Sequence, residues 1–438
     1  MTARIAAELA RTAYSLLLWL ATPAYWARLW WRGGAEPLYR TALGERFGRS
    51  HQVAVPGRVW VHAVSLGETL AAQALVDEIR AAEPNVHILL THGTATGRQA
   101  GLALLRDGDA QAWLPYDTPG AMRSFLRHHQ PTVGVLMETE VWPNLLHQAQ
   151  GLGVPIVLAN ARLSERSLRK GLRLALLMRP ALASFKAVLA QTDDDAQRLR
   201  QMGAQTVEVM GNLKFDLTPD SALLTRGRAW RDALGGRPVV LMASSRAGEE
   251  AALLAAWQGL PTPRPLLLLV PRHPQRFDEV AGLVLASGLA LQRRGAWATS
   301  PPASAAAADV WLGDSVGEMP LYYATAQAAL LGGSFEPLGG HNLIEAAACG
   351  CPVVMGPHTF NFAQAAERSL AAGAAVRVDS LTRGVQQAVA LATDPQHGLF
   401  VQQALAFAAQ HRGAARRMAS QVLMLRVLRV LPVLRKPR

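Results

Sequence analysis

The residues whose types and spacing most clearly indicate a chemical role lie between Gly332 and Glu345, in the stretch GGSFEPLGGHNLIE. The apolar run 328–331 predicts a buried strand before it, and the run 343–348 predicts a helix at its end. Glycines let backbone N–H groups approach a phosphate, and the start of a helix favours negative charge. Glu345, one turn into that helix, could bind a pair of ribose hydroxyls. We therefore interpret the stretch as a nucleotide site, placed late in the chain and unlike the N-terminal fingerprint of a Rossmann dehydrogenase.

A carboxylate suited to proton transfer follows the segment Ser65-Leu66-Gly67. Glu68 comes at the start of the predicted helix 69–80, where the helix N-terminus favours the ionised form. An ionised carboxylate can take a proton from a hydroxyl as a general base. The same position also fits a carboxylate that begins a helix and does no chemistry, and both interpretations stay open on the residues alone.

Two further acids and a lysine follow other predicted strands. Glu138 and Glu140 are two residues apart at a strand end, so their side chains share a face. One of them could stabilise a cationic transition state, or simply pair with Arg162. Lys214 could neutralise a leaving phosphate or a substrate carboxylate, or it could lie on the surface.

A second group of polar side chains comes later in the chain. Arg272 and His273 end an apolar strand, which is a good position for binding a phosphate. His341 and Asn342 carry the donors to assist. None of these residues is specific alone, and their joint placement at the ends of two predicted sheets is what indicates a site.

Short apolar runs alternate with helical patterns in two series along the chain. Strands without polar alternation, separated by helices, are typical of parallel sheets covered on both faces. The first series is 58–65, 87–91, 132–137, 155–159, 187–190 and 207–210, and the second is 239–243, 266–271, 310–312, 328–331 and 353–356. We therefore predict an α/β protein of two doubly wound, Rossmann-like domains that face each other across a cleft.

The local composition and the length of the chain predict where the domains begin and end. The Gly- and Pro-containing stretch 216–236 separates the two series, and a length of 438 residues fits two domains. We assign residues 1–35 to a membrane-anchor segment, 36–216 to an N-terminal domain, and 217–438 to a C-terminal domain with a closing helix. The low-complexity stretch 299–308 is expected to form an exposed loop in the second domain.

The positive charge gathers at the two ends of the chain. The formal net charge is +12, and residues 1–50 hold seven Arg and three Glu, while residues 395–438 hold eight basic side chains and no acid. The middle of the chain is neutral. A nucleic-acid enzyme would usually carry positive charge on its body, so we expect no nucleic-acid partner. Basic ends beside apolar sequence fit an anionic membrane surface better.

Both ends leave alternatives open. The apolar segment 13–27 is shorter than the roughly 20 residues of a spanning helix, and Trp and Tyr residues lie in and after it beside arginines, as in interfacial anchors. A cleaved signal peptide or a buried core helix would also fit this length. The C-terminal run 422–438 could be a second basic amphipathic contact, or a helix that packs across the domains and closes the fold.

Taken together, the motifs resemble the Kdo (3-deoxy-D-manno-octulosonic acid) transferases of lipid A and lipopolysaccharide biosynthesis. The matching segments are VWVHAVSLGET (59–69), THGTATGRQ (91–99), LPYDTP (114–119), METEVWPNLL (137–146), NARLSERS (160–167), GNLKFD (211–216), PRHPQRF (271–277), GDSVGEMPLYY (313–323) and GGHNLIEAAACGCPVVMGPHTFNF (339–362). They extend over both predicted domains in the family's order. Residues 1–55, the loop near residue 300 and the tail after residue 385 are only loosely covered.

The resemblance implies a glycosyltransferase B fold and the transfer of Kdo from CMP-Kdo to the tetra-acylated lipid A precursor, lipid IVA, with inversion at the anomeric carbon. It implies that the N-terminal domain binds the acceptor and that the C-terminal domain binds CMP-Kdo. It also implies that the apolar N-terminus anchors the enzyme to the cytoplasmic face of the inner membrane.

The resemblance further assigns roles to single residues. The Glu of the family's H-A-x-S-x-G-E motif is the general base, which is Glu68 here, and the positions that stabilise the transition state fall on Glu138 and Lys214. The CMP contacts fall on Arg272, His273, Gly317, Glu318, Met319, Asn342, Leu343, Ile344 and Glu345, and we place His341 beside them as a further donor.

Cytidine monophosphate leaves with a single phosphate, which a helix start with Arg272 and Lys214 could neutralise without Mg²⁺. Cys349 and Cys351 lack the further partners that zinc requires. We therefore expect neither a metal nor a cofactor.

Two rival classes stay open on the residues alone. Nucleotide-sugar 2-epimerases share the two-domain plan and act on a UDP-sugar, but they are soluble and do not need a Trp-rich N-terminus. A membrane-associated nucleotide-binding scaffold is the non-enzyme alternative, and the intact base and stabiliser positions argue against it.

Overall fold

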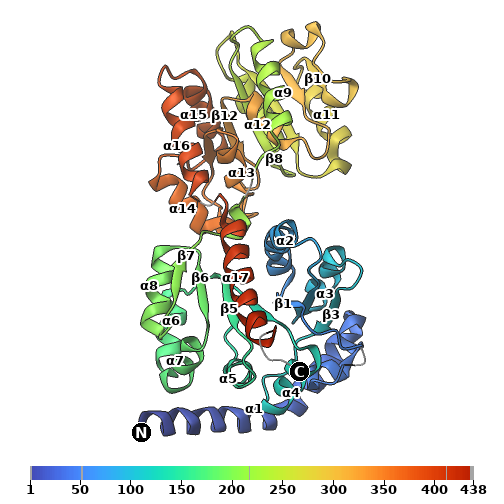
Figure 1. Ribbon diagram of the computed structural model, residues 1–438. Coiled ribbons are helices and arrows are strands. Elements are labelled where there is room, and N and C mark those ends of the chain that lie inside the picture. Colours follow the sequence, from blue (N-terminus) through green and yellow to red (C-terminus); the bar gives the residue numbers. More distant parts are fainter. Residues whose placement is uncertain (1, 51–52, 217, 411, 435–438) are drawn as a thin grey trace. The chain divides into compact units, whose positions relative to one another are not determined.

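The computed structural model describes residues 2–50, 53–216, 218–410 and 412–434 (Figure 1). The chain forms two compact units, one of residues Met1–Asp216 with Gly413–Arg438 and one of residues Leu217–Arg412. The chain therefore leaves the first unit after Asp216 and returns to it at Gly413.

The first unit is built on a parallel sheet in the order β3-β2-β1-β4-β5-β6-β7. Its strands are β1 (Val59–His62), β2 (Ile88–His92), β3 (Ala110–Trp113), β4 (Val133–Met137), β5 (Ile156–Ala161), β6 (Ala187–Ala190) and β7 (Val207–Val209). Its helices are α1 (Thr2–Ala35), α2 (Leu66–Ala82), α3 (Ala95–Gly101), α4 (Pro119–His129), α5 (Pro143–Gly151), α6 (Glu165–Leu172), α7 (Ala175–Ala183), α8 (Asp193–Met202) and α17 (Ala414–Leu434), with short 3-10 turns at Pro37–Arg40, Leu43–Phe47, Leu102–Leu104 and Leu213–Phe215.

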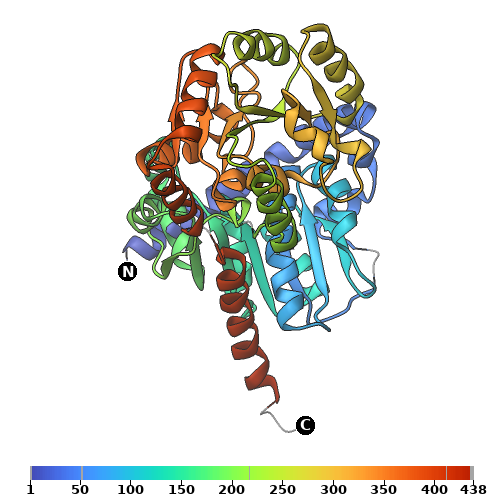
Figure 2. The ribbon, with the colours of Figure 1, turned by 90° about the horizontal axis from the view of Figure 1, so that it is seen from above.

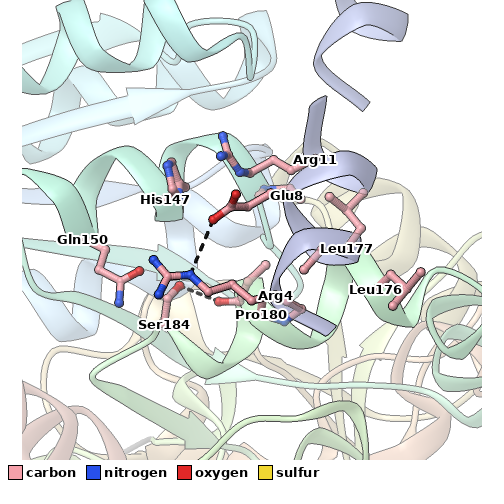
Figure 3. A pocket seen from close by; sticks show the side chains of 12 residues that line it. Arg4, Glu8, Arg11, His147, Gln150, Leu176, Leu177, Pro180 and Ser184 are labelled. Atoms are coloured by element: carbon pink, nitrogen blue, oxygen red, sulfur yellow. Dashed lines mark hydrogen bonds and ion pairs between the residues drawn. The ribbon is translucent and has the colours of Figure 1, made fainter. Parts of the chain in front are cut away.

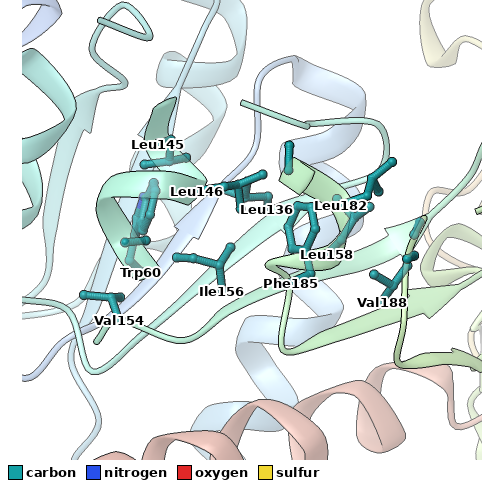
Figure 4. Packing of buried hydrophobic residues seen from close by; sticks show 14 of the residues in the cluster. Trp60, Leu136, Leu145, Leu146, Val154, Ile156, Leu158, Leu182, Phe185 and Val188 are labelled. Carbon is teal, nitrogen blue, oxygen red and sulfur yellow. The ribbon is translucent and has the colours of Figure 1, made fainter. Parts of the chain in front are cut away.

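Both faces of this sheet are buried, because successive side chains of a strand point to opposite faces. Trp60, Leu136 and Leu158 point to the face that is covered by helices α4 to α8 (Figure 4). Val61 and Val135 point to the other face, which α2 and α17 cover. Burial on both faces explains why the central strands are continuous apolar runs in the sequence.

The second unit repeats the plan with the strand order β10-β11-β9-β8-β12-β13-β14, again parallel. Its strands are β8 (Val239–Ser245), β9 (Leu266–Pro271), β10 (Leu291–Arg293), β11 (Val310–Leu312), β12 (Ala328–Leu331), β13 (Val353–Met355) and β14 (Ala375–Arg377). Its helices are α9 (Ser221–Asp232), α10 (Glu249–Gln258), α11 (Phe277–Ala286), α12 (Met319–Thr325), α13 (Leu343–Ala348), α14 (Ala363–Ala371), α15 (Leu381–Thr393) and α16 (His397–Ala409). Short 3-10 turns lie at Pro274–Arg276, Arg294–Ala296, Ala303–Ala307 and Phe360–Phe362.

These sheets confirm the predicted α/β class with two doubly wound sheets, and they differ from the prediction in detail. The strands β3, β10 and β14 were not predicted, and all three lie at sheet edges, where short strands with polar residues give no apolar run. The stretch 216–236, which was predicted to separate the two series, contains α9. The loop 299–308 is not fully exposed, because Ala305 is buried and its carbonyl accepts a hydrogen bond from Trp311 Nε1 at 2.8 Å.

The C-terminal helix α17 completes the first unit. Its residues Ala414, Met418 and Val422 are fully buried in the cluster that includes α2, and Figures 1 and 2 show the red helix along the first unit. The Asp216 carboxylate accepts the N–H groups of Gly413 and Ala415, each at 2.7 Å, and so fixes the start of this helix. The sequence predicted one domain over residues 217–438, and the structure instead returns residues from Gly413 onward to the first unit. Residues 435–438 of the basic tail lie outside the described residues.

The N-terminal helix α1 is 34 residues long and lies against α5 and α7. Two polar side chains of α1 bind the rest of the first unit. The buried Ser15 Oγ accepts a hydrogen bond from Asn144 Nδ2 at 3.0 Å, and the Tyr14 hydroxyl donates to Asp117 at 3.1 Å. Its large apolar side chains are mostly exposed; they include Ile5, Leu9, Leu16, Leu17, Trp19, Leu20, Trp26, Trp30 and Trp31. This exposure excludes the alternative of a buried core helix. Within the part of the chain that the structure describes, we find no helix with the length and apolar character needed to cross a bilayer.

The burial of α17 leads to a prediction about stability. We expect Met418→Ala to lower the free energy of unfolding by about 2–5 kcal/mol, since a fully buried Met leaves a cavity in the core of the first unit. Met424→Ala, on the same helix but 50% exposed, should change it by less than about 0.5 kcal/mol. Urea unfolding followed by circular dichroism measures both, and equal effects of the two substitutions would contradict the packing of α17 described above.

Candidate active site

Polar residues gather in the first unit where β1 and β4 lie side by side. The strand order runs outward in opposite directions from this pair, and ligands of open α/β sheets bind at such points, beyond the carboxyl ends of the strands. Glu68 follows β1, and Glu138 and Glu140 follow β4. Glu138 and Asn160, at the ends of β4 and β5, have left-handed backbone with φ of 55° and 52°. Such strain in residues other than Gly often marks functional positions.

Glu68 combines a structural contact with unusual basicity. Its Oε2 accepts the N–H groups of Val64 and Ser65, and Ser65 Oγ accepts the N–H of Glu68 in return, which is a capping box at the start of α2. Burial raises the pKa of Glu68, and the charges of Glu140 and, less strongly, Glu138 add to this rise, while the Val64 N–H opposes it. Among the described residues no cation pairs with Glu68. The carboxylate is therefore held in place and holds a proton more readily than an exposed glutamate.

Glu138 has the opposite surroundings. It is 2% exposed, and its two oxygens pair with Lys214 Nζ at 2.7 Å and with Arg162 Nε at 2.9 Å. The pairing with Arg162 that the sequence left open is present, and Lys214 joins it. A buried carboxylate needs such partners. Glu138 therefore fixes the positions of two cations at the rim of the sheet.

A buried amide network, which sequence reasoning missed in part, holds Lys214 in place. Gln191 Nε2 donates to the Asn160 carbonyl at 2.9 Å, and Asn212 Nδ2 donates to Gln191 Oε1 at 2.9 Å. Asn160 Oδ1 accepts the Leu213 N–H at 3.0 Å, and Asn212 Oδ1 accepts the Lys214 N–H at 2.9 Å. Gln191 lies in no motif and was not predicted. Its position, as an amide side chain directly after a buried strand, was the feature of the sequence that could have indicated it.

In the second unit, the predicted anion-binding residues come together at the ends of β8, β9 and β12. Burial lowers the pKa of His341 to about 4, with smaller contributions from Arg272, Arg246 and His273. Burial raises the pKa of Glu345, and the Arg272 charge opposes this rise. A Cβ atom on Gly333 would lie 3.4 Å from His341 Nε2 and 3.7 Å from Arg246 Cγ, so these two side chains converge on the bend. With His341 neutral at pH 7 and two arginines charged, the group suits an anionic ligand.

The glycine-rich bend itself differs from the prediction. Its Gly333 N–H is bound by both oxygens of Glu249, at 2.8 and 2.9 Å, and the Phe335 N–H contacts the same carboxylate at 3.4 Å. Glu249 is 1% exposed and also accepts the Arg246 N–H at 2.9 Å. The interpretation of these N–H groups as a phosphate cradle is therefore wrong at Gly333 and Phe335. Any side chain on Gly332 would collide with the Ser244 carbonyl, which explains the glycine there.

Two other predicted segments of the second unit have defined local structure. Asn342 begins α13, with its Oδ1 accepting the Ile344 N–H at 3.0 Å, and Leu343 and Ile344 are buried. Glu318 begins α12, and its carboxylate binds Arg294 at 3.0 Å and also binds Arg226. The side chain of Glu318 is therefore engaged within the unit, and the backbone at Gly317 is left-handed.

Comparisons with known proteins identify relatives of this chain. Residues 41–217 match the family model described as 3-deoxy-D-manno-octulosonic-acid transferase (kdotransferase). The chain is 48% identical over 422 residues to the 3-deoxy-D-manno-octulosonic acid transferase of Bordetella pertussis, which covers 93% of this chain and 97% of the relative. It is 32% identical over 389 residues to the Haemophilus influenzae transferase, covering 86% and 90% of the two chains.

Two solved structures also match. The UDP-GlcNAc 2-epimerase of Neisseria meningitidis bound to UDP-GlcNAc has a TM-score of 0.51 at 14% identity, and the match covers 84% of this chain and 99% of the epimerase. The C-terminal CMP-Kdo binding domain of WaaA from Acinetobacter baumannii is 32% identical over 42% of this chain and 97% of that domain, with a TM-score of 0.39. The likeness to the epimerase is one of fold alone.

Two parallel seven-stranded sheets with polar strand ends define a two-unit α/β protein whose fold resembles that of the epimerase. Within that class, the chain belongs to the 3-deoxy-D-manno-octulosonic acid (Kdo) transferase family. It is therefore a glycosyltransferase, and the resemblance seen in the sequence is confirmed.

The Glu249 contacts lead to a prediction for the second unit. Glu249→Gln replaces one acceptor oxygen by a donor that faces the Gly333 and Phe335 N–H groups, so we expect a loss of about 1–3 kcal/mol in unfolding free energy. Amide exchange at Gly333 should become faster. Glu279→Gln, an exposed carboxylate on α11, should leave the exchange at Gly333 unchanged. Unchanged exchange at Gly333 in the Glu249 variant would show that this carboxylate does not hold the bend.

Proposed function

We propose that the protein is an inverting transferase that moves Kdo from CMP-Kdo to lipid IVA in lipopolysaccharide biosynthesis. Kdo transfer follows from the family, and the donor, the acceptor and the stereochemistry are the proposed parts. The observation that carries the division of roles is the contrast between two neighbouring carboxylates. Glu68 has no cation partner among the described residues and has a raised pKa, while Glu138 is paired with two cations.

This contrast supports Glu68 as the general base. Inversion by direct displacement requires the acceptor hydroxyl to lose its proton as it attacks the anomeric carbon. A carboxylate with a raised pKa takes that proton more readily than an ordinary one. The capping box keeps the Glu68 side chain in one orientation, so the base is positioned before the acceptor binds.

Glu138 and Lys214 support the transition state together. Breaking the bond to CMP develops positive charge on the sugar and negative charge on the leaving phosphate. Lys214 is 40% exposed and held at 2.7 Å by Glu138, which suits a cation that meets an anionic group. Glu138 is buried, so it acts mainly by fixing Lys214 and Arg162 and by its charge.

The second unit supplies the proposed CMP-Kdo site. Arg272 and His273 are exposed and offer donors to the phosphate, and His341 adds a neutral imidazole. The Glu345 carboxylate suits the ribose hydroxyls. The backbone completes the site at Gly317, Glu318, Met319, Asn342, Leu343 and Ile344. We propose that residues 36–216 bind the acceptor and that the second unit binds the donor.

A direct assay tests the function. The purified chain, supplied with CMP-Kdo and lipid IVA, should give a product heavier by Kdo in the mass spectrum. Glu68→Gln should lower turnover by roughly 10²–10⁴-fold while leaving CMP-Kdo binding nearly intact. Glutamine still accepts the two N–H groups of the capping box, so its stability should match the native chain, whereas Glu68→Ala should also lose about 1 kcal/mol.

The outcomes of this assay separate the parts of the proposal. Absence of any Kdo product from the native chain would contradict the donor or the acceptor. Near-normal turnover of Glu68→Gln would remove Glu68 from the role of base and leave the transferase activity standing.

We further propose that α1 binds the cytoplasmic face of the inner membrane. Its exposed leucines and tryptophans stand beside arginines, a combination typical of interfacial helices. A cavity of about 410 Å³ lies beneath its first turns, where Arg4, Glu8 and Arg11 face His147 and Gln150 of α5 (Figure 3). Two arginines against one glutamate leave this cavity positive, which favours lipid phosphates at the surface.

Substitutions on α1 test membrane binding without removing its buried contacts. We expect Leu17→Gln, Leu20→Gln and Trp31→Gln together to lower binding to phosphatidylglycerol vesicles by about tenfold or more, because these side chains are 65%, 79% and 83% exposed. Leu399→Gln with Leu405→Gln, exposed on α16, is the control and should leave binding unchanged. Sedimentation with vesicles measures the bound fraction. Equal binding of the α1 variant and the native chain would contradict the anchor and leave the basic C-terminal end as the alternative.

A further inference from the structure

A buried histidine lies at the end of β1 and has no role in the mechanism above. His62 is 1% exposed, and its Nδ1 lies 2.9 Å from Thr91 Oγ1 and 3.1 Å from the Thr91 carbonyl. Its other nitrogen, Nε2, is buried and has no hydrogen-bond partner among the described residues. Nε2 lies 3.8 Å from the charged atom Glu140 Oε2. Buried polar atoms are rarely left without a partner, so this contact calls for an explanation.

The surroundings of His62 indicate which nitrogen carries the proton. Thr91 Oγ1 accepts a hydrogen bond from Trp60 Nε1 at 2.8 Å, so its own hydroxyl proton is free to point to His62 Nδ1. Nε2 faces the Glu140 carboxylate, whose negative charge favours a proton on that nitrogen, while Nδ1 lies against the two Thr91 oxygens. The other tautomer would direct a lone pair at that carboxylate, which is unfavourable. His62 therefore presents an N–H group to Glu140.

Glu140 is in turn close to the base. Its charge is the second-largest cause of the raised pKa of Glu68, after burial. Its Oε2 also accepts the indole N–H of Trp142 at 2.8 Å. Two donors, His62 and Trp142, thus face a carboxylate whose charge acts on Glu68. Because 3.8 Å exceeds a hydrogen bond, a small movement of Glu140 closes the His62 contact, as catalytic contacts often tighten when substrate binds.

The other charged groups nearby are accounted for. His92 of β2 also neighbours His62, and burial and then the His62 charge lower the pKa of His92 to about 3, so His92 stays neutral. Glu68 faces Glu140, Glu138 and the N–H groups of Val64 and Ser65. The charge of Glu138 is compensated by Lys214 and Arg162. Glu140 has no lysine or arginine partner among the described residues, and it faces the donors His62 and Trp142.

We propose that His62 is a positioning residue for the transfer reaction: it holds and partly compensates the Glu140 carboxylate, and so governs how readily Glu68 takes the acceptor proton. The proposal rests on the proposed role of Glu68 as base. His62 does not take the proton itself, and no group changes its oxidation state or covalent bonding. Glu140 is the link between the two, and it acts through its charge.

The pH dependence of kcat/KM for Kdo transfer tests the proposal, since its acid limb reports the ionisation of the base. Without His62, Glu140 acts more strongly on Glu68, which raises the pKa of the base. His62→Leu should therefore move the acid limb to higher pH by about half a unit to one unit, a loss of about three- to tenfold below the limb. His62→Gln keeps an N–H donor near the same place and should restore the native limb.

Glu140→Gln should move the acid limb in the opposite direction, to lower pH, because it removes the negative charge near Glu68. In the Glu140→Gln background, His62→Leu should cause no further movement. His129→Leu is the matched control, because His129 is also a buried histidine of the first unit but lies on α4. It should leave the limb in place.

Each outcome decides the proposal. An equal loss of rate at every pH in His62→Leu, with the acid limb unmoved, would overturn the proposal. So would a His62→Leu shift of the acid limb that is as large in the Glu140→Gln background as in the native chain. An unmoved limb in Glu140→Gln alone would also overturn it, even where His62→Leu does not fold. A native chain with no Kdo transfer at any pH would instead contradict the proposed function.

Discussion

A buried carboxylate must be compensated, and in this protein the pairing of Glu138 meets that requirement by tying three strand ends together. Glu138 follows β4, Arg162 follows β5, and Lys214 follows β7. The Asn160, Gln191 and Asn212 amides behind them leave the Lys214 turn little freedom. The rim of the first sheet is thus a cross-linked polar surface, on which Glu68 and Glu140 have no lysine or arginine partner among the described residues.

The two units share one local structure at the start of a helix. In each, a glutamate at the start of the first helix after the first strand binds backbone N–H groups of the turn before it: Glu68 in α2 and Glu249 in α10. Glu249 extends this to the bend after β12, and its oxygens are thereby occupied. Glu68 uses one oxygen for the turn, which leaves the other for a substrate. The same structural device therefore supports stability in one unit and, as we propose, catalysis in the other.

The sequence predicted the parts of the fold that burial dictates. Strands such as β6, β9 and β12 have the predicted bounds, because both their faces lie in the core. The edge strands β3, β10 and β14 were missed, since they lack an apolar run, whereas the edge strand β7 was predicted. Candidate residues could be found by their place after a strand, but their partners could not. No local pattern shows that Glu249 reaches Gly333, 84 residues away, or that Lys214 reaches Glu138, 76 residues away.

The return of the chain to its first unit has a consequence for biosynthesis. Residues 217–412 are an insertion, and the bonds from Asp216 to Gly413 and Ala415 hold the two ends of the interrupted unit side by side. During translation the inserted unit can fold as soon as it has emerged from the ribosome. The first unit cannot, since the apolar surface of α2 is covered by α17, which follows the inserted unit in the chain. Chains truncated late in synthesis would therefore expose this surface and become substrates for chaperones and proteases.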